Sequence, residues 1–110
     1  MTVQQLCANG AFTVFNMGDE NKQILNGYCG DFLSNIISRA PDSCAWLTVM
    51  NNVNVAAVAT LIDCACIVLC EGVTPDNALL EKAKGQGLNL LGSDQNAFET
   101  TKSINGLCGV

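Results

Sequence analysis

Two runs of apolar residues constrain this chain more than any other feature. They are Cys44–Met50, which only Thr48 interrupts, and Cys64–Cys70, in which every side chain is apolar. A strand with one face in water alternates apolar and polar residues, whereas a strand buried on both faces does not. Strands of the second kind belong to parallel sheets that helices cover on both sides, so the two runs predict an α/β fold.

The segments around these runs complete the predicted fold. Helix-capping residues and apolar residues at helical spacing alternate with short β-prone stretches. We therefore predict a three-layer α/β/α architecture with a mostly parallel central sheet of four to five strands. The expected helices begin at Thr2, Asp31, Asn51–Asn52, Thr74 or Asp76, and Ser93 or Asp94, and the further strands lie near residues 12–15, 24–28 and 88–91.

Chain length and charge bound the number of domains and the partners. A chain of 110 residues has the size of one domain, so we expect residues 1–110 to form a single domain. Only 14% of the residues are charged, which predicts an exposed apolar surface that a homodimer would cover. The net charge is −5, and the five basic residues are scattered singly. We therefore expect no nucleic acid and no membrane as a partner.

Seven cysteines indicate the cellular compartment. Their number is odd and most lie in apolar runs, whereas a disulfide framework spreads its cysteines through loop-rich sequence. Met1–Gln5 lacks the basic start and long apolar region of a signal peptide, so we expect free thiols in the cytoplasm. Even spacing would place Cys64, Cys66 and Cys70 on one face of a strand. We interpret them as small buried side chains, with metal or cluster binding as the alternative.

Cys29 differs from the other cysteines. It lies between Gly27 and Asp31, next to a predicted helix start, where the pKa of a thiol can be lowered. No candidate general base accompanies it in the sequence. Cys29 is therefore a candidate redox sensor, and no more than that.

The residue types of common enzyme sites are missing. Without histidine the chain cannot build a Ser-His-Asp or Cys-His system, and it lacks the commonest metal ligand. It has no phosphate-binding P-loop motif. Gly85-Gln86-Gly87 begins like a dinucleotide-binding motif, but it follows a predicted helix and so indicates a helix end. We therefore expect a non-catalytic protein with no catalytic residue, no metal site and no resident cofactor.

Two segments are candidates for binding a ligand. One precedes a predicted helix, and the other follows a predicted buried strand, at the sheet end where α/β proteins bind ligands. The alternative is that their polar residues only cap helices. The candidate ligand-binding residues are Gly27, Tyr28, Gly30 and Asp31 in the first segment, and Thr48, Asn51, Asn52 and Asn54 in the second.

Three stretches of the chain resemble a known family. Residues 26–34 resemble a stretch written GYxGDLLS, residues 46–59 one written WITxQxHxNIxAVA, and residues 67–87 one written IIxxGxxPDxxxxxKAxxxGI. Together they resemble the small stand-alone DRTGG-type proteins, which are similar in fold to the N-terminal domain of HPr kinase/phosphorylase. The sequence Asp-Arg-Thr-Gly-Gly, which gives the family its name, is absent from this chain. Met50 and Asn52 stand where the family has glutamine and histidine.

The resemblance implies a compact α/β/α domain, often dimeric, with a regulatory or ligand-sensing role and no catalytic machinery. Our leading hypothesis is therefore a dimeric regulatory module that binds a small molecule, for which a nucleotide is the candidate, or a partner protein. The alternative hypothesis is a cysteine-dependent redox or metal-linked accessory protein.

Overall fold

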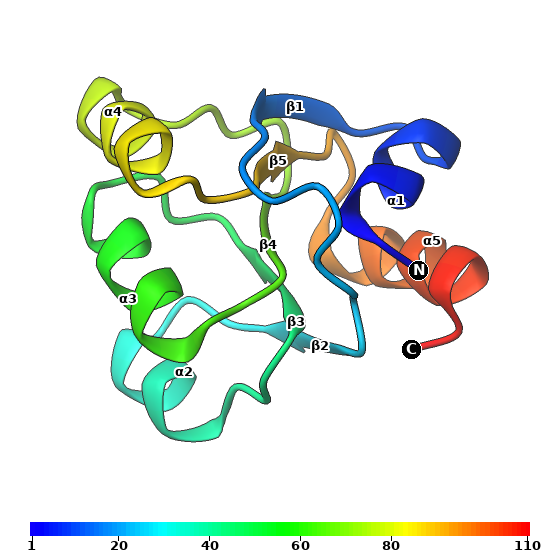
Figure 1. Ribbon diagram of the computed structural model, residues 1–110. Coiled ribbons are helices and arrows are strands. Elements are labelled where there is room, and N and C mark those ends of the chain that lie inside the picture. Colours follow the sequence, from blue (N-terminus) through cyan, green and yellow to red (C-terminus); the bar gives the residue numbers. More distant parts are fainter.

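The computed structural model describes residues 1–110 and contains five helices and five strands (Figure 1). No helix combines the length and the apolar character that are needed to cross a membrane. The elements in chain order are α1 (Val3–Asn9), β1 (Thr13–Asn16), β2 (Asn26–Cys29), α2 (Leu33–Arg39), β3 (Cys44–Thr48), α3 (Asn54–Ile62), β4 (Cys66–Leu69), α4 (Asn77–Gln86), β5 (Leu90–Gly92) and α5 (Ala97–Cys108).

All five strands form one sheet in the order β1-β5-β4-β3-β2. The four strands from β2 to β5 are parallel, and β1 pairs antiparallel with β5 at one edge. Every residue of β3 and β4 is buried, as their apolar sequences predict. The mostly parallel sheet is confirmed.

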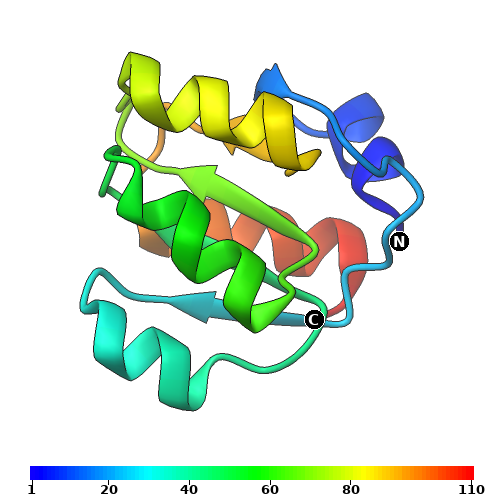
Figure 2. The same ribbon diagram turned by 60° about the vertical axis from the view of Figure 1, so that its left-hand side comes forward.

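Helices cover both faces of this sheet (Figures 1 and 2). We call the face under α2, α3 and α4 the three-helix face, and the face under α1 and α5 the two-helix face. Alternation along β3 sends Trp46 into the core of the first, with Ile36 from α2. It sends Ala45 and Leu47 into the core of the second, which also holds Ile104 from α5. The predicted three-layer architecture is confirmed.

Several helix ends follow their sequence signals. The Thr2 hydroxyl accepts a hydrogen bond from the Gln5 N–H, and the Gln5 side chain accepts one from the Thr2 N–H, which makes a capping box at α1. Asp76 accepts from the Leu79 N–H at 2.8 Å and so caps α4. Gly87 ends α4 with a φ of +64°, a conformation that glycine adopts readily.

Three other predicted helix starts are wrong. Asp31 does not cap α2, because its carboxylate bonds to β3 and Phe32 precedes the helix without a side-chain cap. The helix expected at Asn51–Asn52 begins only at Asn54, since the Asn52 side chain instead accepts from the Asn54 N–H and holds a turn.

The cap of the last helix is also displaced. Asn96, rather than Ser93 or Asp94, caps α5 by accepting from the Glu99 N–H at 2.9 Å. The Ser93 hydroxyl lies inside the protein, 2.9 Å from the Thr100 hydroxyl. Burial of Ser93 at the end of β5 therefore delays the helix by three residues.

The three clustered cysteines do not share a face. Cys64 lies in the core of the three-helix face, whereas Cys66 and Cys70 lie in that of the two-helix face. The prediction assumed one strand from Cys64 to Cys70, but β4 begins at Cys66, so strict alternation does not extend back to Cys64.

A tight contact holds the loop after β1 against the sheet. A Cβ atom added to Gly18 would lie 1.7 Å from the Gly87 carbonyl oxygen, so only glycine fits there. Beside this contact the buried Asn89 side chain donates to the carbonyls of Asp19 and Ala65, and it accepts from the Gly18 N–H. We call the segment before β2, which contains α1 and β1, the amino-terminal arm. Residues far apart in sequence thus fix this arm to the sheet.

Candidate functional site

The two predicted ligand-binding segments meet at the carboxyl ends of β2 and β3. Asp31 Oδ1 accepts from the Thr48 hydroxyl at 2.6 Å and from the Val49 N–H at 2.9 Å. The Thr48 hydroxyl in turn accepts from the Met50 N–H at 3.2 Å. Thr48 is only 2% exposed, whereas Asp31 is exposed. We call these contacts the Asp31 clamp, because they join the loop after β2 to the loop after β3.

The asparagines of the second segment mostly organise their own loops. The Asn51 side chain donates to the Thr74 carbonyl at 2.9 Å, and the Asn51 carbonyl accepts from the Asp76 N–H. Asn52 holds its turn as described above, and Asn54 is exposed at the first position of α3. Asn51 therefore ties the loop after β3 to the loop before α4.

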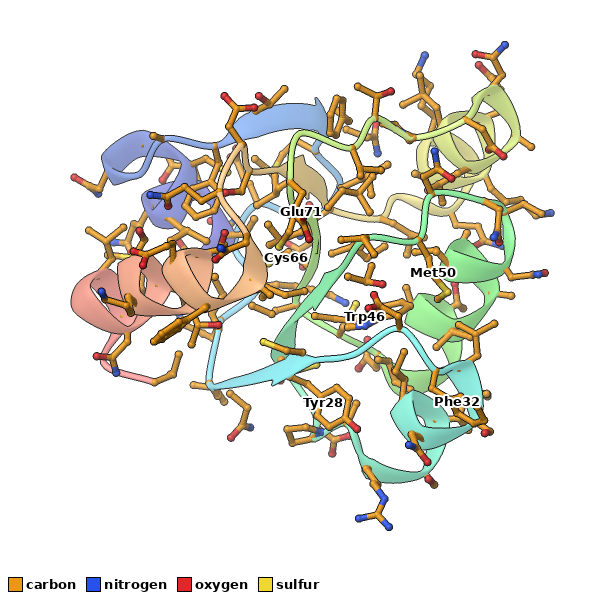
Figure 3. All side chains as sticks on the ribbon, turned by 180° about the vertical axis from the view of Figure 1, so that it is seen from behind. Tyr28, Phe32, Trp46, Met50, Cys66 and Glu71 are labelled. Atoms are coloured by element: carbon orange, nitrogen blue, oxygen red, sulfur yellow. The ribbon has the colours of Figure 1, made fainter.

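The glycine and aromatic residues of the first segment pack beside Trp46. The Trp46 indole N–H donates to the Gly30 carbonyl at 3.0 Å. Tyr28 is half-buried and packs against the core of the three-helix face. A Cβ atom at Gly30 would lie 3.2 Å from the Tyr28 ring, so this glycine lets the ring lie close to the backbone. Figure 3 shows Tyr28 and Trp46 on neighbouring strands.

The charges at this end of the sheet have one sign. The loops that follow the parallel strands contain four acidic residues, at Asp31, Glu71, Asp76 and Asp94, and no basic residue. Exposed helix starts attract anions, but four nearby carboxylates oppose that attraction. This end of the sheet is therefore unsuited to holding a phosphate group by itself.

A cavity of about 170 Å³ opens on the two-helix face, beside β2. It exists because Gly27 lies directly opposite Ala45 in the sheet, so neither strand fills the space with a large side chain. Cys29 is exposed there, with its Sγ 3.4 Å from the Thr101 hydroxyl oxygen. The lining is mostly apolar and consists of Gly27, Tyr28, Cys29, Ala45, Leu47, Thr101, Ile104 and Val110.

This cavity has the size of one aromatic ring with little room to spare. A cavity of about 150 Å³ is enough to bind benzene. Gly27 and Tyr28 were predicted as ligand-binding residues and Cys29 only as a redox sensor, whereas the α5 contribution of Thr101 and Ile104 was not predicted. The clamp residues Asp31 and Thr48 do not line the cavity. The structure thus places Asp31 and Thr48 in a polar clamp and Gly27 and Tyr28 at an apolar cavity. The other candidate residues, Gly30, Asn51, Asn52 and Asn54, belong to neither.

A smaller cavity of about 120 Å³ lies where β1 and β5 meet the loops after β4 and β5, and sequence reasoning missed it. Its lining includes Gly72, Ser93 and Asp94. Glu71 and Gly72 both adopt left-handed backbone conformations there, with φ values of +62° and +71°. The glycine after a buried strand was the available signal, but the partner residues come from β1 and β5.

Burial makes most of the thiols weak nucleophiles. All seven cysteines are free. Burial raises the pKa of Cys44 to about 11 and that of Cys64 to about 12, and it raises the pKa of Cys66 well above its usual value. The same cause raises the pKa of Cys7, Cys70 and Cys108. A thiol reacts and binds metals as the thiolate, so these six are poorly suited to either role. No group of three or more metal-ligating side chains is gathered anywhere in the chain.

Comparison with known proteins assigns a family. The family model described as the DRTGG domain matches residues 28–107. The comparison with curated proteins gave no match. Among solved structures, the CBS and DRTGG domains of the regulatory region of a Clostridium perfringens pyrophosphatase, complexed with the activator diadenosine tetraphosphate, match with a TM-score of 0.71 and 13% identity. The match covers 84% of this chain and 41% of that one, so the likeness establishes a shared fold over part of the larger protein.

Proposed function

This chain belongs to the DRTGG domain family, and on that premise we propose that it is a non-catalytic regulatory module that senses a small-molecule ligand. One observation supports the proposal above others: the three cavity-lining residues of β2 are followed directly by Gly30, which binds Trp46, and then by Asp31 of the clamp. A ligand that displaces Gly27–Cys29 would move Asp31 relative to Thr48. Occupancy of the cavity is thereby converted into a change in the loops after β2 and β3.

We propose a nucleotide as the ligand, bound with its base ring in the cavity. The cavity has room for one ring of a purine base, and its lining is mostly apolar. The second ring and the ribose would lie at the open side of the cavity. The phosphates would lie away from the acidic loops, on the side of α5, where Lys102 follows the cavity-lining Thr101. Lys102 Nζ lies 3.6 Å from a Glu99 carboxylate oxygen, and a phosphate would replace this contact. The Clostridium perfringens regulatory region is complexed with an adenine dinucleotide, and this makes diadenosine tetraphosphate a natural member of the test panel.

Thermal unfolding with a ligand panel tests this proposal. The panel contains adenosine, AMP, ATP, GTP and diadenosine tetraphosphate, each at millimolar concentration. A ligand at about 100 times its dissociation constant stabilises a protein by about 2.7 kcal/mol, which raises the melting temperature of a domain this size by several degrees. If no member raises it, nucleotide sensing is removed and a protein partner becomes the remaining form of the regulatory hypothesis.

A matched pair of glycine substitutions locates the ligand. A Cβ atom at Gly27 or at Gly106 meets no heavy atom within 4 Å, so a larger side chain fits at either position. Gly27→Leu would fill the cavity and abolish the ligand-induced shift. Gly106→Leu lies on α5 outside the cavity lining and should leave the shift unchanged. Equal loss of the shift in both variants would contradict the proposed location.

We further propose that residues 1–110 act as one domain, as a homodimer and in the cytoplasm. Seven free thiols support a reducing compartment. Exposed apolar side chains, including Leu25, Phe32 and Phe98, support a covered surface. Light scattering at micromolar concentration tests the homodimer, and a monomer mass would contradict it.

A further inference from the structure

Strand β2 forms an uncovered edge of the sheet. It pairs with β3 on one side only and ends the strand order (Figure 2). Its register with β3 is regular over all four residues. The opposite edge differs, because a register shift between Val14 and Asn16 interrupts the pairing of β1. Such an irregularity discourages further strand addition, and β2 lacks it.

The backbone of β2 offers hydrogen-bonding groups on its outer side. The Leu25 N–H donates inward to the Ser43 carbonyl. Backbone groups alternate along a strand, so those of Asn26 and Tyr28 point away from β3. Each of these residues carries one donor and one acceptor. Two copies related by a two-fold axis could therefore form up to about four hydrogen bonds between antiparallel β2 strands.

The surroundings of this edge are apolar and carry no charge along the strand. Leu25 is 60% exposed just before β2, and Phe32 is 65% exposed just after it. Figure 3 shows Tyr28 and Phe32 on the side of the molecule that β2 borders. No residue from Ile24 to Gly30 is charged, in a chain whose net charge is −5. Two acidic chains can approach closely only through a surface of this kind.

The two ends of the same edge carry few charges, which are Arg39 and Asp42 at one end and Asp31 at the other. Asp31 lies at the carboxyl end of β2, whereas Arg39 ends α2, which returns the chain to the amino ends of β2 and β3. An antiparallel pair places the amino end of one β2 beside the carboxyl end of the other. Arg39 and Asp42 of one copy, whose charges cancel, would thus come to the end where the other copy carries Asp31. The Asp31 carboxylate already binds Thr48 and Val49. Charge therefore does not oppose the antiparallel pairing that a two-fold axis requires.

We infer that a second copy of this chain binds along β2, so that the two sheets continue into one ten-stranded sheet with the helix layers on the same sides. This inference rests on the proposed homodimer and names its surface. It also places the two ring-sized cavities next to the interface, because Gly27 and Cys29 belong both to the cavity lining and to the paired strand.

Two matched substitutions test the interface by sedimentation over a range of concentrations. Leu25→Lys puts a charge on the β2 edge, and Leu61→Lys makes the same change on α3, where the leucine is 67% exposed. Leu25→Lys should raise the dimer dissociation constant roughly tenfold to a hundredfold, since each dimer would hold two lysines at its pairing strands. Leu61→Lys should leave it unchanged.

Hydrogen exchange of the wild-type chain gives a second readout that needs no variant. The amide of Tyr28 should exchange more slowly as the protein concentration rises through the dissociation constant. Exposed amides in the loops that flank α3 should exchange at an unchanged rate. A dimer that Leu25→Lys does not weaken, or whose Tyr28 amide is not protected, overturns the β2 interface but leaves the homodimer. A wild-type chain that is monomeric overturns both the β2 interface and the homodimer. The nucleotide panel tests ligand sensing independently of this result.

Discussion

The two faces of the sheet differ in how completely they are filled. On the three-helix face, Trp46 and the side chains of α2, α3 and α4 form a closed core. On the two-helix face, α1 and α5 leave a cavity of about 170 Å³ at β2, where Gly27 lies opposite Ala45. The comparison teaches that one face is packed for stability, whereas the other leaves an open cavity at a modest cost in packing, and we propose that a ligand binds there.

The largest expected effect is on the closed face. Trp46→Ala removes a fully buried side chain and leaves the Gly30 carbonyl without its donor. We expect a loss of about 4 kcal/mol in the free energy of unfolding. Urea unfolding followed by circular dichroism measures it, since the variant removes the only tryptophan as a fluorescence probe. A loss below about 2 kcal/mol would show that this face repacks and is not closed.

Two leucines compare the faces directly. Leu69→Ala on the three-helix face should cost about 3 kcal/mol, because its surroundings are closed. Leu47→Ala on the two-helix face should cost about 2 kcal/mol, because it enlarges a cavity that already opens to solvent. Urea titrations of both variants give the difference. Equal losses of unfolding free energy would mean that the cavity does not reduce the cost of removing side chains on the two-helix face.

Alkaline pH tests the buried thiol of the closed face. Burial raises the pKa of Cys64 to about 12, so the folded state keeps a proton that the unfolded state loses from about pH 9 upward. The associated stability is present below pH 9 and is lost as the pH rises toward 12. We expect Cys64→Ala to reduce the loss of stability between pH 8 and pH 10 by about 1 kcal/mol, measured by urea unfolding at each pH.

The smallest effect concerns reactivity and not stability. Cys29 is exposed at the cavity, whereas four cysteines are buried. Labelling of the native protein with a maleimide, followed by mass spectrometry, should modify Cys29 before the four buried cysteines. A cavity ligand should slow this step, and Cys29→Ala should remove it. Fast labelling of Cys66 would revive the cysteine-dependent alternative.

The sequence predicts the elements better than their contacts. Unbroken apolar runs made β3 and β4 recognisable, because burial on both faces leaves no alternation. The predicted start of α2 was wrong because a carboxylate such as Asp31 can accept hydrogen bonds from nearby or from distant donors. Here the distant Thr48 hydroxyl and Val49 N–H donate to it. A polar residue before a helix therefore signals a hydrogen bond without saying to which element.

The cavity shows why the site was only half predictable. Gly27 and Ala45 leave space only because the sheet register pairs them, and the register depends on the whole fold. Thr101 and Ile104 belong to the cavity lining but lie on α5, more than seventy residues after β2 in the sequence. Asn89 carried a visible signal, a polar residue before the apolar pair Leu90–Leu91, although its partners near Gly18 could not be read from the chain.

The Gly18–Gly87 contact has a consequence for the order of folding. The amino-terminal arm is synthesised before the parallel strands, yet β1 pairs only with β5, the last strand of the domain in sequence. Closing so long a loop early is entropically costly, so the arm should dock after the parallel strands have assembled. Gly18→Ala should then speed unfolding and hardly slow refolding, a pattern that stopped-flow kinetics would reveal. The segment that precedes the rest of the domain in sequence would be the last to reach its place.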